Sequence, residues 1–199
     1  MADTSIARTG EVAASKNVHE IIKEAKRIEE TTLYSSKGHF AAAENWSKLH
    51  LWIGVPNAGL AAVAGAMALS FTTQAWIHVL GGGLAIVAAG LASLQTFLNP
   101  NEKAAAHLAA GNNYDALNGQ VRIFWSVECW GGQTELELTE KLKTFANEKE
   151  RLNKSCPQIP SWAYAHAKKG IAAGEGTYVI DTAPTGSSDL PADPPDRGK

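Results

Sequence analysis

The chain of 199 residues is long enough for one domain or two small ones, and its net charge of −2 argues neither for nor against a nucleic-acid partner. Its two cysteines, Cys129 and Cys156, belong to no CxxC motif, which favours free thiols in a reducing compartment over a disulfide. No phosphate-binding glycine loop, GxSxG motif, HExxH motif or Cys/His cluster at metal spacing occurs, so the sequence predicts no enzyme, bound metal or cofactor.

Residues 1–48 are expected to be a cytosolic N-terminal region, with a loose start over residues 1–15 and an amphipathic helix from about Asn17 to Lys48. Apolar residues recur there at helical spacing, with charged residues between them. The apolar positions are Val18, Ile21, Ile22, Ala25, Ile28 and Leu33. Gly38 is expected to loosen this helix shortly before the chain becomes apolar.

The next stretch carries no charge. From Leu49 to Asn101 the chain holds 53 residues without Asp, Glu, Lys or Arg. A bilayer core of about 30 Å takes roughly 20 helical residues to cross, so the stretch is too long for one span and suits two. Lipid offers the backbone no hydrogen-bond partners, which makes two helices the expected form. The sequence therefore predicts a transmembrane hairpin over residues 49–99, with spans at about 51–71 and 76–98; a buried hairpin in a soluble protein is the alternative.

Basic residues flank both predicted spans on the same side. Residues 1–48 carry seven Lys or Arg, the segment after the second span carries eleven, and the connecting turn carries none. The positive-inside rule places such flanks in the cytoplasm. Both termini are therefore expected on the cytoplasmic side of a membrane, with the turn outside.

Small residues recur at every fourth position in both predicted spans. The positions are Gly54, Ala58, Ala62, Ala66 and Ser70 in the first span and Gly81, Ala85, Ala89 and Ser93 in the second. Such stripes let membrane helices approach closely, and one stripe per helix would serve the contact between the two spans. A further row favours contacts between subunits and holds Asn57, Ala61, Ala64 and Ala68. The sequence therefore predicts a homo-oligomer, with a tetramer as the first expectation.

Three polar residues in the spans are candidate pore-lining residues: Asn57, Gln95 and Thr96. Polar side chains at membrane depth tend to face a partner or a water-filled path. For Asn57 a structural hydrogen bond is an equal alternative, and His78 is expected to be wetted near the outer surface. No Asp, Glu or Arg lies within the spans, which argues against a proton relay or a charge-coupled transporter.

A helical cytosolic domain is expected over residues 100–181. Asn99, Pro100 and Glu102 carry the pattern of a capped helix start, and the helix should run to about Trp130. Its apolar side is expected to hold Leu108, Tyr114, Leu117, Val121 and Phe124.

Two glycines, Gly131 and Gly132, should separate that helix from a second one reaching about Asn153. The apolar positions of the second helix recur at heptad-like intervals, which predicts packing against a neighbouring helix or subunit. They are Leu138, Leu142, Phe145 and Leu152. Ser161 is expected to cap a short third helix, and residues 182–199 have the composition of a disordered tail.

These features together resemble the SLATT family, a bacterial two-span effector domain associated with SMODS nucleotidyltransferases and SLOG sensor proteins. The resemblance covers roughly residues 15–181 and rests on the order of the amphipathic helix, the uncharged hairpin and the helical extension. Three segments carry it further: FLNPNEKAAAHLAAGNNYDAL, which contains His107 and Tyr114, then CPQIPSWAYAHAKKGI and GEGTYVID. The resemblance implies an effector of anti-phage defence in the bacterial inner membrane, controlled by a nucleotide-derived signal from a separate nucleotidyltransferase.

A nucleotide signal needs Lys or Arg for its phosphates and an aromatic or Arg plane for its base. Two cytosolic clusters offer that combination. One is Arg122 with Trp125, and the other consists of Trp162, Tyr164, His166, Lys168 and Lys169. In both clusters, ordinary packing or a solvated helix face is the alternative.

The expected function is a homo-oligomeric ion channel or pore controlled by that signal. Two helices cannot enclose an ion path, so a pore requires several subunits around an axis. The alternative is a membrane scaffold that conducts nothing and recruits a partner protein through its cytosolic helices.

Overall fold

The computed structural model describes residues 3–71 and 73–178, with side chains from Asn17 onward. Its regular elements in this part of the chain are all helices, which confirms the expected all-helical fold. They are α1 (Asp3–Ala68), α2 (Ala75–Leu98), α3 (Pro100–Ser126), the short 3-10 helix η1 (Glu128–Trp130), α4 (Glu135–Ser155) and α5 (Ser161–Ala172). The predicted tail, residues 182–199, lies outside the described residues.

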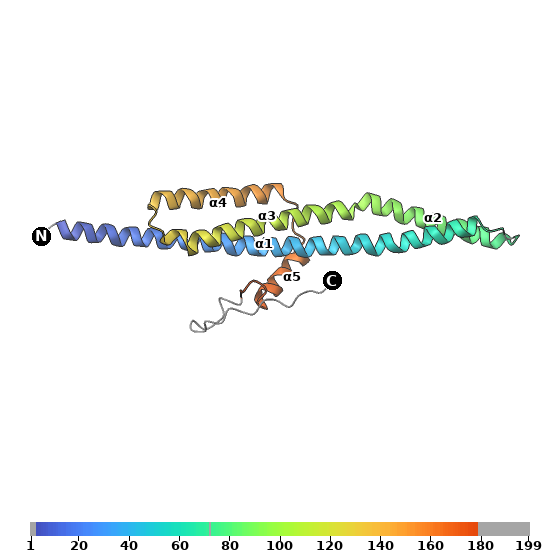
Figure 1. Ribbon diagram of the computed structural model, residues 1–199, viewed down its shortest axis with the longest axis horizontal. Helices are drawn as coiled ribbons and strands as arrows, with labels where there is room; N and C mark the ends of the chain where they lie inside the picture. The colour runs from blue at the N-terminus through green and yellow to red at the C-terminus, as the bar shows by residue number, and fades with distance from the viewer. Residues whose placement is uncertain (1–2, 72, 179–199) are drawn as a thin grey trace, which may run out of the picture.

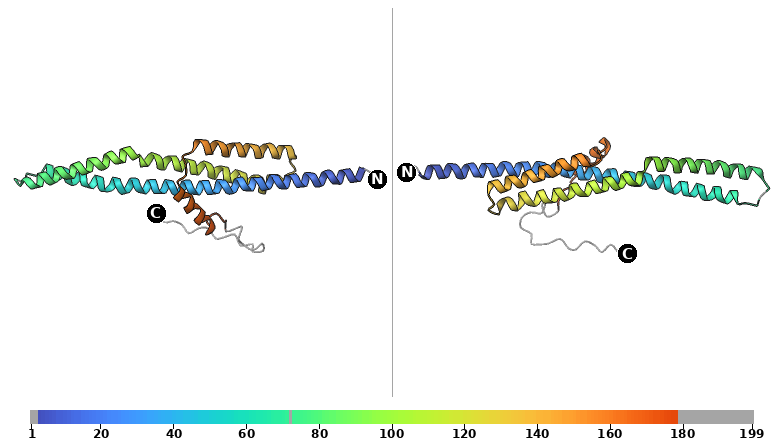
Figure 2. Two further views of the ribbon diagram at one scale, coloured as in Figure 1. Left: turned by 180° about the vertical axis from the view of Figure 1, so that it is seen from behind. Right: turned by 90° about the horizontal axis from the view of Figure 1, so that it is seen from above.

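The molecule is long and narrow because α1 runs through most of its length (Figure 1). One half of the molecule consists of α2 lying beside the C-terminal part of α1. In the other half, α3 and α4 lie beside the N-terminal part of α1, as both views in Figure 2 also show. The short α5 packs on the opposite side of α1 from α4 (Figure 1).

The amphipathic segment and the first apolar segment form one helix, which begins at Asp3, so the loose start expected for residues 1–15 is wrong. Gly38 and Pro56 both lie inside α1, so the boundary predicted at residue 48 falls within a helix and Gly38 does not end one. Gly38 is packed tightly: a Cβ atom there would lie 3.0 Å from Cγ2 of Ile159. Packing of this kind compensates for the weak helix propensity of glycine.

The second apolar helix, α2, runs back along α1. Gly81, near its start, lies against Met67, and Gln95, near its end, lies against Gly54. Both apolar segments are long and apolar enough to cross a membrane, by length and composition. They leave most of their surface uncovered, since only 6% of the most apolar window in the first and 11% in the second is buried inside the structure.

Asn99 joins α2 to α3 in a way that differs from the predicted capping box. Its backbone is left-handed, with φ 42° and ψ 56°, and its N–H donates to the carbonyl of Gln95. A helix N-cap needs an extended backbone, whereas a left-handed residue typically ends a helix. Asn99 therefore caps the end of α2, and its side-chain amide donates to the carboxylate of Glu102. Pro100 is the first residue of α3, as predicted.

A three-helix core lies between α1, α3 and α4. Its buried members are Ile21, Ile22, Ala25 and Ile28 from α1, Tyr114, Leu117, Val121 and Phe124 from α3, Cys129, and Leu138, Phe145 and Leu152 from α4. The predicted apolar faces are confirmed with two corrections: Leu33 is only partly buried and lies outside this core, and Leu108 is 49% exposed. The buried face of α3 includes His107 instead, and Leu108 is turned about 100° away from it.

Two helix starts in the second half of the chain have clear local causes. Gly132 has φ +80°, a left-handed backbone that ends the helical segment after η1, as predicted. The hydroxyl of Thr134 then accepts from the N–H of Glu137, whose carboxylate accepts from the N–H of Thr134, so that α4 begins with a capping box. The predicted cap at Ser161 is wrong by one position, because Pro160 has the extended backbone of the cap and Ser161 is the first helical residue.

Candidate functional site

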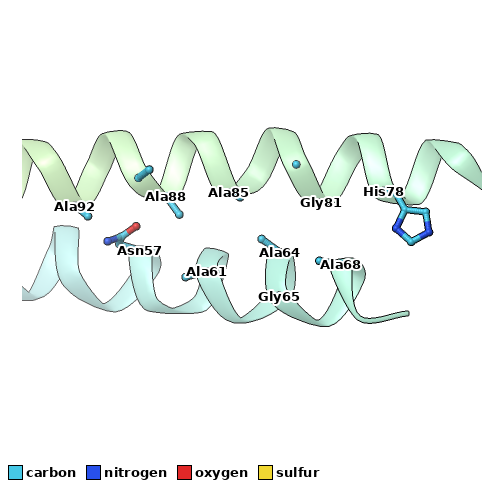
Figure 3. A pocket seen from close by; sticks show the side chains of 12 residues that line it. Asn57, Ala61, Ala64, Gly65, Ala68, His78, Gly81, Ala85, Ala88 and Ala92 are labelled. Carbon is cyan, nitrogen blue, oxygen red and sulfur yellow. The ribbon is translucent and has the colours of Figure 1, made fainter. Parts of the chain in front are cut away.

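The first candidate site is the groove between α1 and α2, called here the span groove. It has a volume of about 620 Å³ and is lined by small residues of both helices, with Asn57 toward one end and His78 at the other (Figure 3). The helices approach closely beside it, since a Cβ atom at Gly81 would lie 3.0 Å from Cβ of Met67. Small side chains therefore allow the two helices to pack along this length.

On α2, Gly81, Ala85 and Ala89 of the predicted stripe do line the span groove, whereas the rows of small residues on α1 are used differently from the prediction. The face of α1 toward α2 holds Asn57, Ala61, Ala64 and Ala68, the row expected to serve contacts between subunits. Ala58, Ala62 and Ala66 belong to the stripe assigned to the contact between spans, and they are exposed. A step of four residues turns a helix by about 40° beyond a full turn, so an every-fourth row drifts off one face; alternating steps of four and three stay on it.

The three predicted pore-lining residues have different surroundings. Asn57 points into the span groove (Figure 3), and its Oδ1 atom is buried without a hydrogen-bond partner among the described residues. The alternative of a structural hydrogen bond to this oxygen is therefore not realised among the described residues. Gln95 Nε2 lies 3.1 Å from Nδ1 of His50, which links α2 to α1. Thr96 is exposed, and its hydroxyl donates to the carbonyl of Ala92 at 2.9 Å.

The predicted pair of Arg122 and Trp125 is divided between separate partners. The indole Nε1 of Trp125 donates to Oε2 of Glu29 at 2.6 Å, and the ammonium of Lys26 lies 4.3 Å from the centroid of the indole ring. The guanidinium of Arg122 lies 4.3 Å from the ring centroid of Tyr178. Trp125 thus takes part in the contact between α1 and α3, which agrees with the alternative that this residue serves ordinary packing.

Trp162 and His166 lie one helical turn apart on α5 and face α1. They line a small pocket of about 140 Å³, whose α1 side holds Ala41, Glu44, Asn45 and Lys48. Trp162 is 47% exposed, so its ring is only partly committed to this contact. The ammonium of Lys48 in this pocket already pairs with the carboxylate of Glu44 at 2.5 Å, so it is not free for a phosphate group.

The other members of the α5 cluster point elsewhere. The ring centroid of Tyr164 lies 6.0 Å from that of Tyr34, with the two rings tilted by 32°. Lys168 and Lys169 are both exposed. The two lysines therefore present their charges to a dissolved anion.

A groove between α3 and α4, called here the amide groove, was not foreseen from the sequence. It has a volume of about 540 Å³ and is lined by Asn113, Ala116, Leu117, Gln120, Thr144, Phe145, Asn147, Glu148 and Arg151. Three carboxamides therefore surround an apolar floor. The signal for it was the seven-residue spacing of Asn113 and Gln120 beside the apolar side of α3.

Buried polar side chains lie between α1 and α3. The side-chain amide of Asn118 donates to the carbonyl of Glu29 at 2.6 Å and lies 3.2 Å from Oγ1 of Thr32. Farther along α1, His39 meets His107 with their Nδ1 atoms 2.9 Å apart. Sequence reasoning missed His39, although it continues the buried face of α1 at steps of three and four residues.

Within residues 17–71 and 73–178, no group of three or more His, Cys, Asp or Glu side chains could hold a metal ion. The candidate sites therefore consist of two grooves, the exposed lysines of α5 and the buried histidine pair. No family model, curated protein or solved structure matches the chain, and the resemblance to SLATT domains stays a prediction.

Proposed function

We propose that this chain is a two-span membrane protein that assembles into a homo-oligomer, conducts ions through the assembled spans and is controlled through its cytosolic helices. The single observation that carries the proposal is the uncovered apolar surface of α2 and of the second half of α1. Helices in the core of a soluble protein bury such segments, so this surface needs lipid or neighbouring subunits around it. The flanking basic residues orient both termini toward the cytoplasm.

The span groove supports conduction over a sealed hairpin. The buried Oδ1 of Asn57 lacks a donor in the single chain, which is unfavourable in hydrocarbon, and water in the groove of an assembled protein would supply that donor. The groove belongs to one subunit, and neighbouring subunits would close it into a path. Its walls of small residues leave room for such neighbours.

Control would reach the spans along α1. The helix that forms the first apolar segment is the same helix that packs against α3 and α4, so a shift of the bundle acts directly on the span. The exposed Lys168 and Lys169 on α5 form a surface to which an anionic signal could bind. By its resemblance to SLATT domains, the proposal extends to a bacterial inner-membrane effector of anti-phage defence that receives a nucleotide signal from a separate nucleotidyltransferase.

We expect the purified chain to release potassium from liposomes, and Asn57→Leu to lower that flux by about tenfold, because the apolar side chain would fill and dry the groove. A potassium electrode measures efflux with and without a set of linear and cyclic mono- and dinucleotides. Val55→Leu is the matched control, since Val55 is 68% exposed on the same helix and should leave flux unchanged.

The same assay separates control from conduction. Replacing Lys168 and Lys169 together with alanine should abolish the nucleotide response and preserve the basal flux. An assembled oligomer that releases no potassium with any of the nucleotides contradicts the channel.

We expect Ala62→Leu combined with Ala66→Leu to weaken assembly, because both residues are exposed on α1 and larger side chains would keep a neighbouring helix at a distance. Mass photometry in mild detergent should show a shift to smaller species. Val63→Leu, at a 52% exposed position between them, is the control. If the unchanged chain is a uniform monomer in this measurement, both the oligomer and the pore are wrong.

One observation favours a second function, a scaffold that conducts nothing. Four large apolar residues are exposed around the turn from α3 to α4. That turn lies at the end of the bundle farthest from the span turn (Figure 1). The four residues are Ile123, Val127, Trp130 and Leu136, with exposed fractions from 53% to 73%. Exposed apolar residues of this size suit a protein partner. The liposome measurement decides between the two functions.

A further inference from the structure

A buried histidine pair joins α1 to α3 on the cytosolic side of the apolar segments. Nδ1 of His39 lies 2.9 Å from Nδ1 of His107, and the two side chains belong to residues that are 1% and 5% exposed. The ring of His39 also stacks on Tyr114, with centroids 5.5 Å apart and planes 16° apart. The pair is therefore enclosed and held in one geometry.

The distance between the two nitrogens requires a definite protonation state. A neutral imidazole has one N–H donor and one acceptor nitrogen, so a bond between two Nδ1 atoms needs Nδ1–H on one ring and a bare Nδ1 on the other. A proton added to the acceptor ring would leave two N–H groups pointing at each other. The hydrogen bond would be lost, and a charge would be buried in its place.

The groups facing the pair offer no negative charge to compensate. A pocket of about 250 Å³ adjoins His39, and its polar lining comprises Ser35 of α1, Tyr114 of α3, Asn153 of α4, and Cys156 and Gln158 beyond it. Tyr114 donates its hydroxyl hydrogen to Oδ1 of Asn153 at 2.7 Å, and burial, with the nearby Cys156, raises the pKa of Tyr114 to about 12. One turn before His107 on α3, the ammonium of Lys103 lies over the ring of Trp46.

The environment therefore disfavours a proton on either ring. Burial, followed by the charge of His107, lowers the pKa of His39 to about 4, and burial also lowers the pKa of His107. Among the described residues, no carboxylate contributes to either pKa. The pocket beside His39 gives water, and with it protons, a route toward the pair.

The pair lies close in sequence to both apolar helices, so a change at the pair can affect how these helices are held. His39 precedes the first apolar segment by twelve residues, and His107 follows the end of α2 by nine. Between His107 and α2 lies the left-handed break at Asn99, where the direction of the chain can change. Separation of α1 from α3 at the pair would therefore alter how the bundle holds both apolar helices.

We propose that the His39–His107 pair is an acid-sensitive lock: one hydrogen bond between two neutral imidazoles holds α3 against α1, and uptake of a proton by the pair releases it. The lock is a property of the cytosolic bundle and does not depend on ion conduction. Its failure would leave the channel proposal untouched, and the reverse also holds.

The direction of the pH effect follows from the lowered pKa. The unfolded chain binds the protons first as the pH falls, because its histidines keep the ordinary value of 6.5. The stabilisation by the pair is complete above about pH 6.5 and is lost progressively as the pH falls toward 4. Over that interval the unfolding constant should rise by about tenfold per pH unit for each proton by which the two states differ.

The test compares the unchanged chain with the double variant His39→Asn and His107→Asn, which keeps an amide near each Nδ1 position and cannot titrate. Unfolding in mild detergent is followed by circular dichroism between pH 7.5 and 4.5. The unchanged chain should lose stability more steeply than the double variant, and the control His166→Asn, at an exposed residue, should behave like the unchanged chain. Exposed ion pairs such as Glu148 with Arg151 are common to all three and cancel.

A second measurement decides the matter even where the double variant does not fold. Nitrogen-15 NMR of the imidazole rings in the unchanged chain should show two neutral rings of opposite tautomer at pH 7.5 that resist protonation below pH 6. Two rings that titrate near 6.5, or equal pH slopes for the unchanged chain and a folded double variant, would overturn the lock.

Discussion

Replacing Leu138 with alanine is expected to lower the free energy of unfolding of the bundle formed by α1, α3 and α4 by about 2–5 kcal/mol. Leu138 is 1% exposed and lies in the core shared by α1, α3 and α4. The loss combines the transfer free energy of the missing methyl groups with the cavity left among fixed neighbours. Denaturation of the purified chain in mild detergent, followed by circular dichroism, measures it.

Leu136→Ala is the matched control for that change. Leu136 lies two residues earlier on the same helix and is 72% exposed, so the same substitution should change stability by about 0.5 kcal/mol or less. Equal losses at the two positions would show that α4 does not pack on α1 and α3 by the face described here. A bundle that loses its α4 contacts would also lose the amide groove.

Replacing Gly111 with alanine should destabilise the contact between α1 and α3 by about 1–3 kcal/mol. A Cβ atom at Gly111 would lie 2.7 Å from both Cδ1 and Cε1 of Phe40, so the aromatic ring or the helix must move. The substitution acts close to the histidine pair, because His107 precedes Gly111 on α3 by one turn. The same denaturation measurement reports the change.

Gly119→Ala on the same helix should have the opposite sign. A Cβ atom at Gly119 would meet nothing within 4 Å, and alanine favours the helix over glycine by about 1 kcal/mol. Because both substitutions replace glycine with alanine on the same helix, comparing them separates the effect of close packing on stability from the effect of helix propensity. If Gly111→Ala also stabilises the chain, α1 and α3 do not approach each other as closely as the structure has them.

Local pattern was sufficient for the helices and for most of their buried faces. Ile21, Ala25 and Ile28 in α1, and Leu138, Phe145 and Leu152 in α4, lie in the core where the spacing of apolar residues predicts them. The break at Gly132 follows from the backbone freedom of a single residue. The charge-free stretch likewise predicts two apolar helices, because the charge and hydropathy of a segment are properties of its own residues and do not depend on tertiary contacts.

Which partner each face meets was decided by the tertiary structure. The row through Asn57 and Ala64 contacts α2, whereas Ala62 lies outside that contact, and the choice depends on how far each helix is rotated about its axis. Trp125 meets Glu29 across 96 residues of sequence, and His39 meets His107 across 68. Periodicity fixes the face of a helix on which a side chain lies, but contacts between distant residues depend on how whole helices pack, and no local spacing contains that information.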